Sequence, residues 1–83
     1  MNTAAPPVLL DFTVDVKSGD IFVKFFPAGE VSPVSVVLCS GQGLTEQFRL
    51  ALKKQNRKAA ETLVDQAFRQ GKCSVVTENP FAK

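Results

Sequence analysis

Residues 8–26 read VLLDFTVDVKSGDIFVKFF and decide the fold class of this 83-residue chain. Apolar and polar residues alternate in the first half, so that two sets fall on opposite sides: Leu10, Phe12, Val14 and Val16 against Asp11, Thr13, Asp15 and Lys17. A period of two is typical of a strand with one buried and one solvent-exposed face. Ser18-Gly19-Asp20 follows as a turn, because Gly19 tolerates a positive φ. The stretch therefore predicts an antiparallel hairpin.

The second strand of this hairpin, residues 21–26, is apolar on both faces. Ile21, Val23 and Phe25 form one face, while Phe22 and Phe26 flank Lys24 on the other. A single layer of helix covers only one face of a sheet, so we expect Phe22, Lys24 and Phe26 to form a dimer or partner interface. Burial in the core of the same chain and stacking of unpaired bases are the alternatives.

The pattern continues outward from the hairpin as one more strand, a helical region and a last strand. Residues 31–39 predict a third strand whose beginning lies outside the sheet, because Pro33 cannot donate to a ladder. Residues 45–70 contain no Gly or Pro and predict a long helix, with Thr45 as N-cap and Gly71 as the C-terminal stop. Residues 73–78 predict a fourth strand. The order β-β-β-α-β gives an α+β fold, an antiparallel sheet of three to four strands packed by one helical layer.

The helical region leaves one alternative open. Its apolar residues form two stripes about a quarter-turn apart, one within residues 44–59 and one within residues 60–68. A long helix that curves over the sheet and two helices broken near residue 55 both fit this pattern. We favour one long helix, because no Gly or Pro marks a break. In the alternative, this region is kinked or broken near residue 55.

The length permits one domain, which we place at residues 8–78, with a flexible N-terminal arm at 1–7 and a tail at 79–83. No apolar run approaches the ~20 residues of a membrane span, and no signal-peptide pattern precedes the first strand. We therefore expect a cytoplasmic location and no membrane contact. In that reducing compartment, Cys39 and Cys73 are expected as small buried hydrophobic residues.

The composition argues against an enzyme. The chain has no His, so the commonest general base and metal ligand is absent, and two Cys are too few for a zinc site within one chain. Nothing assembles a nucleophile, a base and an oxyanion site. We expect no catalytic residue, metal, cofactor or small-molecule substrate.

Positive charge is concentrated in the second half of the chain. Residues 1–48 carry a net charge of −3 and residues 49–83 a net charge of +5. Five cations follow one another with no acid between them: Arg49, Lys53, Lys54, Arg57 and Lys58. On one helix, Arg49, Lys53 and Arg57 would stack in a column, an arrangement that suits the phosphates of nucleic acid.

These features lead to two hypotheses of different classes. The first is a small regulatory or accessory protein that binds nucleic acid, with DNA as first choice, through the basic helix. The second is a protein-binding adaptor or inhibitor that acts through its apolar sheet face or edge, with the basic helix offered to an acidic partner. In both cases we expect a homo-oligomer.

Overall fold

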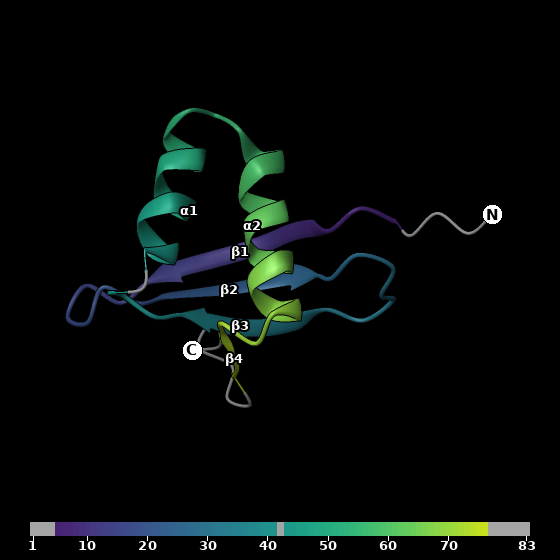
Figure 1. The fold of residues 1–83 in the computed structure, drawn as a ribbon, viewed down its shortest axis with the longest axis horizontal. Coiled ribbons are helices and arrows are strands. Elements are labelled where there is room, and N and C mark those ends of the chain that lie inside the picture. The colour runs from purple at the N-terminus through teal and green to yellow at the C-terminus, as the bar shows by residue number, and fades with distance from the viewer. Residues whose placement is uncertain (1–4, 42, 77–83) are drawn as a thin grey trace.

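The computed structural model describes residues 5–41 and 43–76 and confirms the α+β fold. The elements follow in the order β1 (Val8–Val14), β2 (Ile21–Phe26), β3 (Val34–Leu38), α1 (Leu44–Lys53), α2 (Arg57–Arg69) and β4 (Ser74–Val75). The strands form one antiparallel sheet in the order β1-β2-β3-β4 (Figure 1). Neighbours in the chain are therefore neighbours in the sheet, as in a meander.

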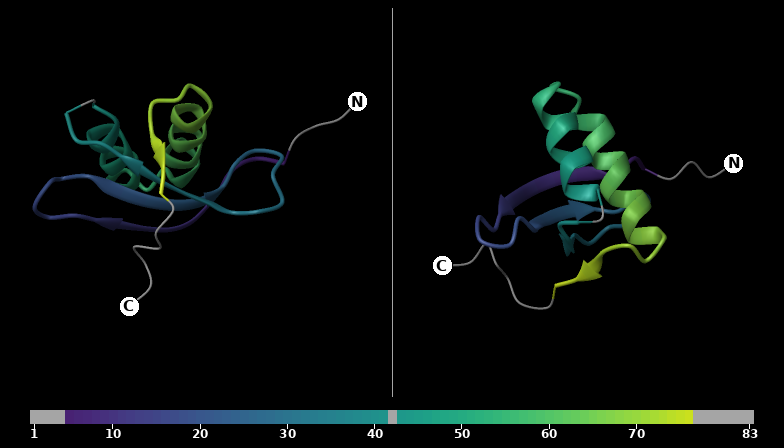
Figure 2. Two further views of the ribbon diagram at one scale, coloured as in Figure 1. Left: turned by 90° about the horizontal axis from the view of Figure 1, so that it is seen from below. Right: turned by 60° about the vertical axis from the view of Figure 1, so that its left-hand side comes forward.

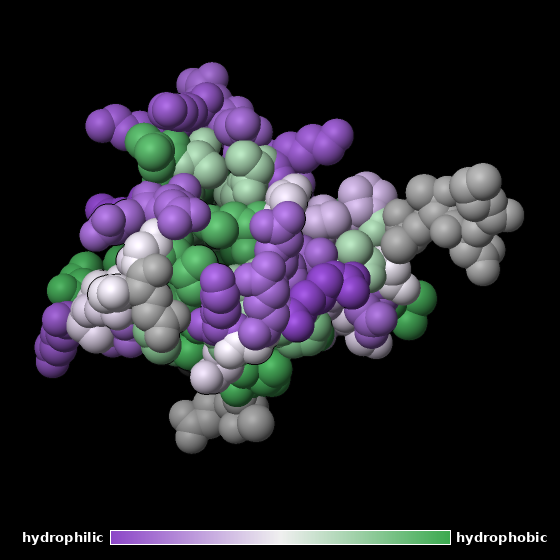
Figure 3. Space-filling view, viewed as in Figure 1, coloured by the Kyte–Doolittle hydropathy of each residue, from purple (hydrophilic) through white to green (hydrophobic). Residues whose placement is uncertain are grey.

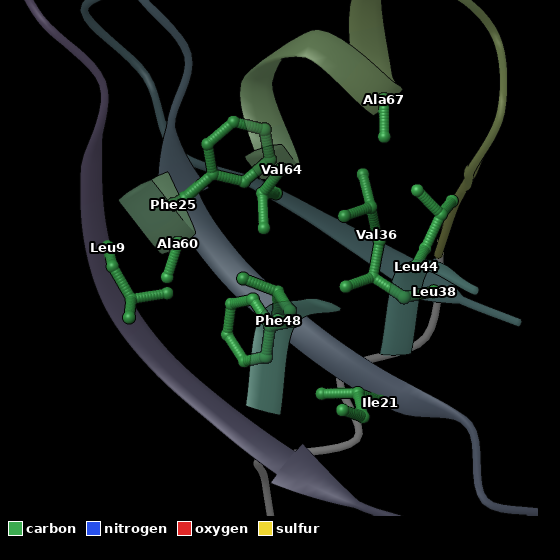
Figure 4. Packing of buried hydrophobic residues seen from close by; sticks show 11 residues of the cluster. Leu9, Ile21, Phe25, Val36, Leu38, Leu44, Phe48, Ala60, Val64 and Ala67 are labelled. Atoms are coloured by element: carbon green, nitrogen blue, oxygen red, sulfur yellow. The ribbon is translucent and has the colours of Figure 1, made fainter. Parts of the chain in front are cut away.

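Both helices lie on the same face of the sheet (Figure 2). The hydrophobic core fills the space between these two layers. The predicted inner face of β2 is confirmed, because Ile21, Val23 and Phe25 are completely buried. Phe48 of α1 and Val64 of α2 pack over this face, with Leu9, Val36, Leu38, Leu44, Ala60 and Ala67 completing the cluster (Figure 4).

A β-bulge corrects the predicted faces of β1. Leu9 pairs with Phe25 and Asp11 with Lys24, so Leu10 is an extra residue on this strand. Leu9 is buried, whereas Leu10, which we expected to face inward, is 44% exposed. Beyond the bulge the predicted phase returns. The ring of Phe12 meets that of Phe48 edge to face, 5.4 Å between centroids, and Val14 packs against the core. Val16 lies past the end of β1 and is exposed, contrary to its expected inward position.

The last two strands are shorter than predicted. β3 begins after Pro33 rather than at Val31, in agreement with the inability of proline to donate to a ladder. β4 has two residues instead of the six predicted at 73–78, and it pairs with β3 through Val36 and Val37. Residues 77 and 78, like the expected tail at 79–83, lie outside the described residues.

The helical region is two helices, so the prediction of one long helix is wrong and the alternative break near residue 55 is confirmed. Gln55 adopts the left-handed conformation with φ 59°. Its N–H donates to Leu52 O, and the N–H of Asn56 donates to Ala51 O, a Schellman ending for α1. Asn56 then caps α2, because its Oδ1 accepts from the N–H of Ala59 at 3.1 Å.

The two ends of the helical hairpin differ in how well the sequence predicted them. Gly71, with φ 71°, terminates α2 as expected: the N–H of Lys72 donates to Ala67 O. At the start of α1, the N-cap is Gly43 and not Thr45. Thr45 lies inside the first turn and is buried, because the helix begins one residue before it.

Two ion pairs on α2 bind main-chain groups of the sheet layer, and we call them the α2 clamps. Glu61 accepts from the N–H of Leu9 at 2.7 Å, and Arg57 donates to the C=O of the same residue. Asp65 accepts from the N–H of Ala28 at 3.0 Å, while Arg69 donates to Ala28 O at 2.8 Å. In both clamps an acid binds the N–H and an arginine binds the C=O of one residue.

The clamps also hold each pair together along the helix. Glu61 lies 3.6 Å from the Nε of Arg57, and Asp65 lies 3.0 Å from the Nε of Arg69, both at a spacing of i, i+4. The two carboxylates are largely buried, with side chains 15% and 10% exposed.

One further contact ties the predicted N-terminal arm to the sheet layer, since Ala5 O accepts from the N–H of Gly29. No helix in the described ranges is long and apolar enough to cross a membrane.

We predict that Val14→Asp unfolds the domain or lowers its melting temperature sharply. The change places a carboxylate without a partner against the core, at a cost of about 2 kcal/mol or more. Val16→Asp is the matched control, because Val16 is 91% exposed and lies two residues further along. Thermal unfolding followed by circular dichroism measures both. Equal melting of the two variants would show that the inner face of β1 is assigned wrongly.

A second prediction concerns the α2 clamps. Asp65→Ala leaves the N–H of Ala28 and the Arg69 guanidinium without their carboxylate, so we expect a loss of about 2 kcal/mol in the free energy of unfolding. Glu61→Ala is expected to behave similarly. Gln66→Ala, on the exposed side of the same helix, should change it by less than about 0.5 kcal/mol. Urea denaturation compares the three variants, and an Asp65→Ala variant as stable as Gln66→Ala contradicts the proposed contribution.

Candidate nucleic-acid interface

The five predicted cations gather at the connection between the two helices. Arg49 and Lys53 belong to α1, Lys54 is its C-cap, and Arg57 and Lys58 form the first turn of α2. All five are exposed. We call residues 53–58, Lys-Lys-Gln-Asn-Arg-Lys, the hairpin tip. It lies at the end of the hairpin furthest from the sheet in Figure 1, and hydrophilic side chains cover this end in Figure 3.

The predicted column of Arg49, Lys53 and Arg57 does not exist. A column needs one continuous helix, and the chain reverses direction at Gln55. The break replaces a stripe along a helix with a compact group of charges on a short turn. Arg49 lies one turn before Lys53 on α1, beside Glu46 and Leu50 in a shallow depression.

Arg57 differs from the other four because it has a structural partner. Its guanidinium pairs with Glu61 and donates to the C=O of Leu9, although its side chain remains 64% exposed. Sequence reasoning counted Arg57 only as a binding residue and missed the α2 clamps altogether. The available signal was the opposite charges at i, i+4 in Arg57–Glu61 and Asp65–Arg69, a spacing that permits ion pairs on a helix.

The remaining four cations, Arg49, Lys53, Lys54 and Lys58, make no ion pair within residues 5–41 and 43–76. Lys58 occupies the first turn of α2, which contains no acid. The positive end of the helix dipole lies there, so a cation at this position is unfavourable for the helix. Lys53 and Lys54, in contrast, lie favourably at the negative end of α1. Contacts and helix dipoles therefore explain Arg57, Lys53 and Lys54 in part, whereas Lys58 has an unfavourable position and no ion-pair partner among the described residues.

The two amides of the hairpin tip are not equivalent as hydrogen-bonding groups. Asn56 uses its Oδ1 to cap α2, which leaves its NH₂ group for a ligand. Gln55 is exposed, and its side chain makes no hydrogen bond to any described residue. The hairpin tip can thus present amide donors between its cations.

Phe22, Lys24 and Phe26 lie on the opposite side of the molecule from the hairpin, on the face of the sheet that the helices do not cover (Figure 2). All three are half-buried. They share this outer face with residues that pair with them across the sheet, among them Val8 and Val37. The structure does not bring these three residues together with the five cations, so the two predicted sites are separate surfaces.

The outer edge of β1 is partly closed to an added strand. The α2 clamps bind both main-chain groups of Leu9, and the N–H of Phe12 donates to the carboxylate of Asp11 at 2.8 Å. The bulge at Leu10 further disturbs the edge. A peptide strand could not pair continuously along β1, because these side chains and the bulge occupy its path.

A hollow of about 790 Å³ lies between the helices and the ends of β3 and β4. Gln47, Gln66 and Gln70 contribute uncharged amides to its lining, together with Cys39 and Lys72. Amides cannot transfer protons at neutral pH, so this lining favours hydrogen bonding. No group of three or more metal-ligating side chains occurs in the part of the chain that the structure describes.

Two pKa shifts mark local contacts away from the hairpin tip. Burial, together with the neighbouring Cys39, raises the pKa of the Cys73 thiol, so it stays protonated at neutral pH. The N–H of Ser40, which donates to Asp20 at 2.8 Å, lowers the pKa of that carboxyl group. Asp20 thereby joins the turn before β2 to the segment that follows β3.

The hairpin tip and the outer face of the sheet are the candidate interaction surfaces among the described residues. Comparison with known protein families, curated proteins and solved structures found no match for this chain.

Proposed function

We propose that this protein binds nucleic acid through the hairpin tip, with duplex DNA as the preferred form. The placement of Lys58 carries this proposal. Two cations open α2 at the end where the helix dipole opposes them, and among residues 5–41 and 43–76 only Arg57 of the two has a carboxylate partner. An unfavourable cation without an ion-pair partner in the described part of the chain indicates that its charge serves a ligand.

Phosphate is the ligand chemistry that these groups fit. Lys53, Lys54 and Lys58 supply mobile ammonium groups, and the first N–H groups of α2 point in the same direction as its positive dipole end. Such contacts hold the sugar–phosphate backbone and carry no sequence information directly. Binding is therefore expected to tolerate many sequences and to weaken steeply with salt.

A regulatory or accessory role follows from binding of this kind, without catalysis. The two free thiols, Cys39 and Cys73, are compatible with a reducing compartment, and we include a cytoplasmic location in the proposal. The protein-binding alternative loses support at the β1 edge, where side chains already bind the main chain. An acidic protein partner at the hairpin tip remains the competing explanation of the same charges.

The test is a fluorescence-anisotropy titration with duplex and single-stranded oligonucleotides at low and moderate salt. Lys53→Glu/Lys58→Glu removes two favourable contacts and adds two repulsive ones, so duplex affinity should fall by more than about tenfold. The slope of log affinity against log salt should decrease by about one for each lost contact. The melting temperature should change little, because both side chains are exposed and free of ion pairs with described residues.

Lys17→Glu/Lys72→Glu is the matched control. It changes the net charge by the same amount at two exposed positions, one in the turn before β2 and one after α2. This variant should bind duplex almost as well as the unmodified protein. If both double variants lose the same duplex affinity, the effect is one of net charge alone. If the unmodified protein does not bind duplex at low salt, the proposal is refuted. Arg57 is unsuitable as a probe, because its loss also breaks a clamp.

A further inference from the structure

The two cysteines of the chain lie at the ends of neighbouring strands. Cys39 directly follows β3, and Cys73 directly precedes β4. The two strands are antiparallel partners, and Val37 lies opposite Ser74 in their register. Both cysteines are free thiols and are half-buried rather than fully enclosed in the core. Each thiol is therefore accessible to a small reagent.

The register of β3 and β4 brings the two cysteines within reach of each other. Continued by one residue, it sets Leu38 opposite Cys73 and leaves Cys39 one step further along the chain. Opposite residues on antiparallel strands are about 5 Å apart and one residue adds about 3.3 Å along the strand, so the Cα atoms of Cys39 and Cys73 are about 6 Å apart. A disulfide bridges Cα atoms that are about 4.4–6.8 Å apart.

Both cysteines also lie on the helix side of the sheet. Cys73 packs against the core cluster, as expected of a residue opposite the buried Leu38. Cys39 would face outward if β3 continued, but β3 ends at Leu38, and Cys39 lines the hollow between the helices and the strand ends. Burial is the main cause of the raised pKa of the Cys73 thiol, and the charge of Cys39 adds to it, so the two thiols are close neighbours.

We propose that Cys39 and Cys73 form a dithiol site that a low-molecular-weight disulfide, such as glutathione disulfide, oxidises to an internal disulfide. The thiolate of one cysteine attacks a sulfur of the reagent, whose S–S bond breaks, and the first glutathione leaves as a thiol. The second cysteine gives up its proton and attacks the sulfur of the mixed disulfide, which expels the second glutathione. The protein loses two electrons and two protons, and the reagent takes them up as two thiols.

The internal disulfide would join β4 to the end of β3 and close residues 39–73 into a loop. This loop contains both helices and the hairpin tip. β4 has two residues and contributes few hydrogen bonds, so a covalent link adds to its attachment. Closing a loop also removes conformations from the unfolded chain, which stabilises the native state. Oxidation is thus expected to stabilise the domain, a property that is independent of nucleic-acid binding.

The test places the folded protein, at low micromolar concentration, in a glutathione redox buffer and follows its intact mass after alkylation of the remaining thiols. The oxidised protein should lose the mass of two hydrogen atoms and carry neither glutathione nor alkylating agent. The ratio of internal disulfide to dithiol should be at least about tenfold higher in the folded chain than in the same buffer with denaturing urea. On oxidation the melting temperature, measured by circular dichroism, should rise by about 5 °C or more.

Three variants serve as controls, and circular dichroism of their reduced forms checks that each is folded. Cys39→Ala and Cys73→Ala leave one thiol each, so each should stop at a single glutathione adduct and melt no higher after oxidation. Val37→Cys/Cys39→Ala is the matched geometric control. Position 37 is as far from Cys73 along the ladder as position 39, but its side chain lies on the outer face beside Phe22. Its two thiols should bind separate glutathiones.

Three results would overturn the inference. The first is an unmodified protein whose thiols stay reduced or carry separate glutathiones, since the two cysteines would then be out of reach of each other. The second is a disulfide that forms between two chains and appears as a dimer on a non-reducing gel. The third is an internal disulfide that lowers the melting temperature or forms equally well in the geometric control, because such a bond does not fit the native register.

Discussion

The binding of α2 to main-chain groups of the sheet layer is the constraint on which the rest of the structure depends. Arg57, Glu61, Asp65 and Arg69 follow one another at intervals of four residues, and together they bind Leu9 at the start of the sheet and Ala28 beyond the end of β2. The same helix places Val64 and Ala60 in the core. Polar clamps thus determine where α2 sits along the strands, while apolar burial supplies most of the stability.

The clamps also shape the surface that remains for partners. They bind Leu9 at an edge that would otherwise attract another strand, in keeping with the general need to protect sheet edges. Since one edge is closed in this way and the helices cover the inner face, the outer face is the side of the sheet that the described helices leave open (Figure 2). The hairpin tip lies on the helix side of the sheet, so the two exposed surfaces are separate (Figure 2).

Local sequence patterns were sufficient for the fold class and for the inner face of β2. Alternation over Ile21, Val23 and Phe25, the turn at Gly19, Pro33 at the start of β3 and Gly71 after α2 all act within a few residues, so the sequence carries their signal directly. The exposure of the five cations is also local, because charged side chains seldom lie in a core. Their arrangement was not predictable from that pattern, since it depends on the path of the chain between them.

Tertiary contacts decided the features that local patterns missed. The bulge at Leu10 exists because the core accepts Leu9 opposite Phe25 and Phe12 against Phe48, and no alternation within β1 reveals that requirement. Gln55 takes a conformation that favours glycine, because packing of both helices on one sheet face requires the chain to turn there. Arg57 became a clamp residue through Leu9, 48 positions away in the chain. Sequence by itself determined which segments form strands and helices, whereas the positions of the breaks and the partners of the charges followed from how those segments pack.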